Sequence, residues 1–169
     1  RPFHFWIDYD VAMSNEQVDI WSDVRSAEAS GSLPLMRSAY EGVLKKVPDL
    51  PAAWLKLGQI CLLEGTYRNA LTATLEAANA TRRSSRWQAL PHVGRQLWRF
   101  DERLLIRELI EEADWDSPFV LSESAVLAQQ LWLVGADAPA LALLEHAMAR
   151  LPPHHLLHFS KAEVLSHLG

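Results

Sequence analysis

Apolar side chains recur at three- and four-residue steps through most of the chain. Within residues 53–63, Trp54, Leu57 and Ile60 follow one another at this spacing. Such a stripe is typical of an amphipathic helix. The next segment carries small residues on one side, at Ala70, Ala73 and Ala77. Small side chains let two antiparallel helices approach closely. No segment of strand length alternates apolar and polar residues with a period of two. The pattern predicts an all-α chain.

Glycines divide this helical pattern into units of similar length. Gly31 and Gly65 are 34 residues apart, as are Gly135 and Gly169, and the 70 residues between Gly65 and Gly135 leave room for two units. Prolines stand 17 residues after Gly31 and Gly135, where the missing N–H ends a helix. Each unit is therefore expected to be a helix, a tight turn at glycine, a second helix and a proline-containing turn.

Two stretches carry a family pattern. Trp54-x-x-Leu57-Gly58 is followed by Gly65-x-Tyr67-x-x-Ala70 and by Ala77. This run resembles a tetratricopeptide repeat. A second copy has Leu127-Ala128, Gly135, Ala140, Ala147 and Pro152, and Gly31, Tyr40 and Pro48 fit the back half of an earlier copy. The resemblance implies an α-solenoid of antiparallel hairpins wound into a right-handed superhelix.

The copy between these two is degenerate. Trp87 and Leu90 match Trp54 and Leu57, but Pro91 then replaces the small residue, and no glycine marks the turn near Phe100-Asp101. A proline at this place is expected to kink the helix or to begin it. We expect one array over residues 17–169, with units at about 17–50, 51–83, 84–118 and 119–153 and a half unit at 154–169.

Residues 1–16 precede the array and contain Phe3, Phe5, Trp6 and Tyr9. Exposed aromatic rings are costly in water, so this segment is expected to pack as a lid over the first hairpin. The alternative is a segment that docks on a neighbouring copy and produces self-association.

The resemblance implies that the first helices line a concave groove for a protein or peptide partner. Apolar anchors mixed with amide and arginine donors suit an extended peptide. The residues expected on this face are Trp21, Arg25, Leu55, Gln59, Leu62, Gln88, His92, Arg95, Arg99, Gln129, Trp132, Phe159 and Glu163. For Trp21 the alternative of packing inside stays open. Family members that clamp chaperone tails use Lys and Asn where Leu55 and Gln59 stand, so that function is not supported.

The charge of the chain is unevenly distributed. The whole chain carries −5, whereas residues 82–107 hold seven arginines against Asp101 and Glu102. An acidic total argues against a nucleic-acid partner, including the alternative of an RNA-reading helical repeat. Arg95 and Arg99, one turn apart on one helix, and Arg103 and Arg107, likewise paired on the next, form an array that could bind an acidic or phosphorylated partner. The favoured interpretation is instead a solvated face whose arginines pair with nearby glutamates.

Catalytic motifs are not found in the sequence. There is no phosphate loop, nucleophile elbow or zinc-protease motif. His154 and His158 are four residues apart, a spacing that can hold a metal, but a polar helix start is the favoured interpretation. Cys61 lies in an apolar stripe and is expected in the core. We expect no enzyme activity, no cofactor and no metal.

The remaining predictions concern the compartment of the protein and the longer protein to which the chain belongs. No 18-residue apolar run predicts a membrane span, so a soluble and cytoplasmic protein is expected. The chain begins with Arg1 rather than Met, which indicates a segment of something longer. By analogy with the family, the array could be the non-catalytic arm of a multidomain enzyme, for example one with a sulfotransferase-type domain.

Overall fold

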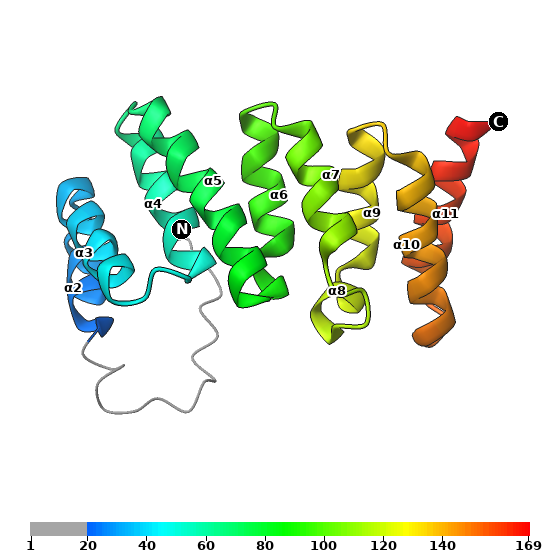
Figure 1. Ribbon diagram of the computed structural model, residues 1–169, viewed down its shortest axis with the longest axis horizontal. Coiled ribbons are helices and arrows are strands. Elements are labelled where there is room, and N and C mark those ends of the chain that lie inside the picture. The colour runs from blue at the N-terminus through cyan, green and yellow to red at the C-terminus, as the bar shows by residue number, and fades with distance from the viewer. Residues whose placement is uncertain (1–19) are drawn as a thin grey trace.

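A computed structural model describes residues 20–169 of the chain, and within that range every regular element is a helix. The predicted all-α solenoid is confirmed (Figure 1). The predictions for the aromatic segment 1–16 lie outside the described residues. The helices are α2 (Ser22–Ser30), α3 (Leu33–Lys46), α4 (Pro51–Leu63), α5 (Tyr67–Ser84), the 3-10 helix η1 (Trp87–Ala89), α6 (Leu90–Arg99), α7 (Arg103–Glu112), α8 (Pro118–Ser122), α9 (Ser124–Leu133), α10 (Asp137–Arg150) and α11 (His155–Leu168).

The helices follow one another in chain order along the long axis of the molecule (Figure 1). Among the described residues the helices form four hairpins, α2–α3, α4–α5, α6–α7 and α9–α10, and α11 packs against α10. The first helices of successive hairpins also contact each other directly, α4 with α6, α6 with α9 and α9 with α11. These four helices therefore make a continuous layer, whose solvent-exposed side we call the first-helix face.

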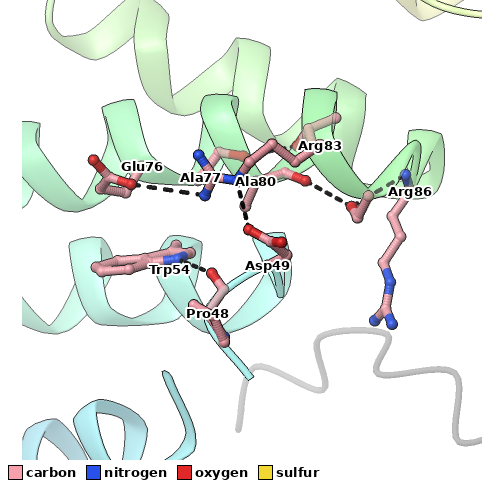
Figure 2. A network of polar contacts seen from close by, with 10 residues as sticks. Pro48, Asp49, Trp54, Glu76, Ala77, Ala80, Arg83 and Arg86 are labelled. Atoms are coloured by element: carbon pink, nitrogen blue, oxygen red, sulfur yellow. Dashed lines mark hydrogen bonds and ion pairs between the residues drawn. The ribbon is translucent and has the colours of Figure 1, made fainter. Parts of the chain in front are cut away.

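Two clusters of buried apolar side chains hold the stack together, and Trp54 packs against both. The helices of the second hairpin approach closely because Ala70, Ala73 and Ala77 are almost fully buried between them. Polar contacts join the same hairpin to the preceding loop (Figure 2). The Trp54 indole N–H donates to the Pro48 carbonyl at 2.8 Å, and Arg83 pairs with Asp49 at 2.5 Å.

The third hairpin turns without a glycine. Gly65 and Gly135 adopt φ of 76° and 78° after α4 and α9, and Asp101 adopts 58° after α6. In each case the following N–H bonds the carbonyl five residues back, as from Glu102 to Leu97 at 3.2 Å. Aspartate tolerates the left-handed region better than most residues. Asp101 therefore supplies the turn that glycine makes in the other hairpins.

This turn corrects the match expected for the third unit. Gly94 precedes Asp101 by seven residues, as Gly58 precedes Gly65, and both glycines are buried. Gly94, not Pro91, therefore corresponds to Gly58, the small residue that follows Leu57 in the family pattern, and we call this position the small-residue place. The expected match of Trp87 and Leu90 to Trp54 and Leu57 is wrong by three residues. The offset arises before α6, where Ser85 takes a φ of 52° and η1 adds a short turn. Pro91 is the second residue of α6 and so begins the helix.

Candidate partner-binding groove

The small-residue place defines which side chains face outward from the first-helix layer. Gly58, Gly94 and Ala128 occupy it in α4, α6 and α9 and are buried against the neighbouring helix. Residues one and four positions later lie together, about a turn apart, on the same side of each helix. These pairs are Gln59 and Leu62, Arg95 and Trp98, and Gln129 and Trp132.

A hollow of about 250 Å³ lies between α9 and α11. Four residues expected on the groove line it, namely Gln129, Trp132, Phe159 and Glu163. The Phe159 side chain is 62% exposed, and the Trp132 ring lies 4.7 Å from the His167 ring, centroid to centroid. This hollow offers two aromatic surfaces beside an amide and a carboxylate.

A second hollow of about 170 Å³ lies between α6 and α9. Arg95, Trp98 and Leu133 line it, and it shares Val126 and Gln129 with the first hollow. Trp98 is 42% exposed and the Arg103 guanidinium lies over its ring, 5.2 Å from the centroid. The two hollows together form one surface, here called the C-terminal groove, that runs from α6 across α9 to α11.

Several residues expected on the groove lie elsewhere. Trp21 and Leu55 are only 8% and 3% exposed, so the prediction that they face a partner is wrong. Both pack in the apolar core, Leu55 from the side of α4 that meets its neighbours and Trp21 from the position just before α2. Leu62 stands on the first-helix face of α4 but is half-buried against the core and lies outside the C-terminal groove, and Gln88 is exposed on η1 rather than on α6. Arg25 is exposed on α2, away from the C-terminal groove.

Trp98 is a groove residue that the sequence analysis missed. Matching Trp87 to Trp54 placed Gln88 and His92 on the groove and left Trp98 unassigned. Taking Asp101 as the turn residue assigns Trp98 correctly, since it then stands where Leu62 and Trp132 stand in their helices. The sequence does contain a signal for this turn, because aspartate is one of the residues that tolerate a positive φ. It was not recognised because the turn was expected at a glycine.

The arginine-rich stretch is divided between two environments. Four arginines are ion-paired on the surface: Arg82 with Glu112, Arg83 with Asp49, Arg103 with Asp101 and Arg107 with Glu111. This agrees with the interpretation of a solvated face for those four. Within residues 20–169, the other three, Arg86, Arg95 and Arg99, are exposed and form no ion pair.

His92 is half-buried on α6, next to the groove. Burial lowers the pKa of His92, the positive charge of Arg95 lowers it further, and Glu123 acts in the opposite direction. The neutral imidazole is therefore favoured over the charged form at this place.

Two glutamines fix the distance between successive first helices. Gln96 on α6 lies over Gly58 and donates from Nε2 to the Thr74 hydroxyl at 2.7 Å. Gln130 on α9 lies over Gly94 and donates from Nε2 to the Pro91 carbonyl at 2.8 Å. Each side chain uses the space left by a missing Cβ, so the helices that carry the groove approach closely.

The histidine and the cysteine considered above for metal binding or reactivity, His154 and Cys61, take part in a helix cap and in the apolar core. The His154 imidazole accepts a hydrogen bond from the Leu156 N–H and caps α11. Cys61 is buried in the core beside α5. The part of the chain that the structure describes contains no group of three or more His, Cys, Asp or Glu that could hold a metal ion. It also contains no helix with the length and hydropathy of a membrane span.

Comparison with known proteins supports the fold. No family model matches the chain, and no curated protein matches it. Chains of solved structures do match, among them the crystal structure of MamA protein, which is 16% identical. The match covers 90% of this chain and 82% of that chain with a TM-score of 0.60. The chain thus has the architecture of the helical-repeat, α-solenoid class.

Proposed function

We propose that this chain is a tetratricopeptide-like interaction module that holds an extended segment of a partner protein in the C-terminal groove. The observation that carries the proposal is the continuity of the two hollows. They share Val126 and Gln129 and present Trp98, Trp132 and Phe159 along one face. Aromatic side chains provide most of the binding energy at such interfaces, and amide and charged groups satisfy the partner's polar groups.

A third hollow is larger but less suited to an extended peptide. It lies between α2 and α3, measures about 400 Å³ and is lined by short side chains such as Ser26, Ser38 and Ala39 together with larger ones such as Leu35 and Lys46. The described residues that line it include no aromatic side chain to anchor a partner. The proposal therefore rests on the C-terminal groove.

Polar residues along the first-helix face favour protein over RNA. The position after the small-residue place holds Gln59, Arg95 and Gln129, so only one of these three helices presents a cation there. A repeat that reads one base per unit needs phosphate and base contacts along the whole array. Neutral and positive positions alternate instead, which suits a peptide.

The test is selection of binders from a displayed library of random twelve-residue peptides, followed by affinity measurement with the synthetic peptides. We expect binding of the selected peptides to weaken by at least tenfold in the double variant Trp98→Ala/Phe159→Ala, because both rings are exposed groove anchors. The matched control is Leu104→Ala, since Leu104 is 75% exposed on α7, a second helix.

Amide chemical shifts of the labelled protein locate the peptide. Shifts confined to α6, α9 and α11 support the proposal. Peptides that bind the Trp98→Ala/Phe159→Ala variant as tightly as the unmodified chain, or that shift only the second helices, contradict it.

A further inference from the structure

The charge of the C-terminal groove changes along its length. Its α6 end carries Arg95, with Arg99 one turn further along the same helix. Its centre carries the neutral Gln129, and its α11 end carries Glu163. A partner segment lying along this surface therefore meets positive charge at one end only.

The two arginines at the α6 end, like the exposed Arg86 outside the groove, differ from the four ion-paired arginines of the arginine-rich stretch. Arg82 and Arg107, for example, lie within 2.7 Å and 3.3 Å of glutamate oxygens. Within the described part of the chain, Arg95 and Arg99 have no such partner and are exposed. A guanidinium binds a carboxylate through two parallel hydrogen bonds, so this pair is ready to receive one.

The aromatic anchors lie at a defined distance from these arginines. Helices α6, α9 and α11 contact in succession, and packed helix axes are about 8–10 Å apart. The hollow between α9 and α11 is thus roughly one and a half helix spacings, about 12–15 Å, from the α6 arginines. An extended chain advances about 3.3 Å per residue, so roughly four residues span that distance.

We infer that the partner segment carries an aspartate or glutamate about four residues from a large apolar side chain. The carboxylate binds Arg95 and Arg99, and the apolar side chain enters the hollow beside Trp132 and Phe159. This inference rests on the proposed function and specifies the chemistry of the partner that the same groove accepts.

The test uses the peptides selected on the unmodified chain. We expect them to be enriched in Asp or Glu about four positions from an aromatic or large aliphatic residue. Replacing that acidic residue by its amide should weaken binding at least fivefold at low salt, and raising the salt should remove most of the difference.

Charge reversal provides the complementary measurement. The variant Arg95→Glu/Arg99→Glu should weaken binding of the acidic peptides at least tenfold and recover affinity for a peptide with Lys in place of the acidic residue. The matched control is Arg86→Glu, since Arg86 is exposed outside the groove in the same stretch. Unchanged helical circular dichroism shows that the double variant folds.

The outcomes separate this inference from the proposed function. Peptides that shift α9 and α11 but show neither acidic enrichment nor dependence on Arg95 and Arg99 overturn the inference and leave the proposed function standing. A requirement for a phosphorylated residue also overturns it, because the carboxylate would then not be the recognised group. Failure of every selected peptide to shift the first helices overturns both.

Discussion

Replacing each of three helical glycines by alanine should have a different effect on the free energy of unfolding: a gain at Gly42, almost no change at Gly94 and a loss at Gly58. Alanine is about 1 kcal/mol more favourable than glycine in a helix interior. At Gly42 in α3 an added Cβ meets no atom within 4 Å. Gly42→Ala should therefore raise the free energy of unfolding by about 0.5–1 kcal/mol, or the melting temperature by about 1–4 °C.

At Gly94 the added Cβ would lie 2.2 Å from the Gln130 Oε1 atom. Gln130 is half-buried, so its side chain can swing toward solvent at the cost of its hydrogen bond to Pro91. That loss, about 1 kcal/mol, offsets the gain in helix propensity. Gly94→Ala should leave stability nearly unchanged.

At Gly58 the added Cβ would lie 2.4 Å from the Gln96 Nε2 atom, 3.2 Å from the Thr74 hydroxyl and 3.4 Å from the Ala70 carbonyl. Gln96 is 5% exposed, so its amide cannot reach water without leaving the core. Losing its bond to Thr74 while staying buried costs about 1–3 kcal/mol, and the crowded rotamer adds about 1 kcal/mol. After the helix gain, Gly58→Ala should destabilise the chain by about 1–3 kcal/mol.

Thermal and urea unfolding followed by far-UV circular dichroism measure all three variants. Whole curves are compared, since stacked hairpins can unfold in steps. The variant Gly58→Ala/Gln96→Ala isolates the cause, because the clash is absent without Gln96 and the glycine substitution should then cost little. A Gly58→Ala protein as stable as the parent, or one whose loss persists on the Gln96→Ala background, would refute this reasoning.

The further predictions concern the turns at Asp101 and Gly135 and the titration of His92 on α6. Asp101→Gly should stabilise the chain by up to about 1 kcal/mol, because it removes the strain of a left-handed aspartate at φ 58°. Gly135→Ala at φ 78° should destabilise it by at least about 1 kcal/mol. Shifts of opposite sign in thermal melts check both, and a destabilised Asp101→Gly contradicts the assigned turn. Burial and then Arg95 lower the pKa of His92 in the folded chain, so protonation of His92 favours the unfolded state. The stability that is present above the ordinary histidine pKa should therefore fall as the pH drops toward and through the pKa of His92 in the folded chain. His92→Gln should lose this part of the pH dependence, and Arg95→Gln should raise the pKa of His92 in an NMR titration; an unchanged pKa contradicts the contribution of Arg95.

Much of the fold follows from local patterns, whereas the groove does so only in part. Gln129, Trp132 and Phe159 were assigned from spacing and do line one hollow. The turn at Gly135 places the unit of Gln129 and Trp132 unambiguously, and Phe159 stands on the first helix of the next unit. Trp98 was missed and Leu55 was misplaced. For Trp98 the reason is that Asp101 makes a turn that glycine makes elsewhere. For Leu55 it is that burial depends on how the next helix packs.

The amino-acid sequence alone determined the helices, the glycine turns and the stacked hairpin architecture. Apolar spacing, turn residues and helix-ending prolines act within one or two hairpins, so a linear pattern records them. Only the tertiary structure decided that Gly58 and Gly94 receive glutamines from the following first helix and that two hollows merge across α9. The physical reason is that these features depend on the distance and rotation between separate helices. Packing sets both, and no local spacing encodes them.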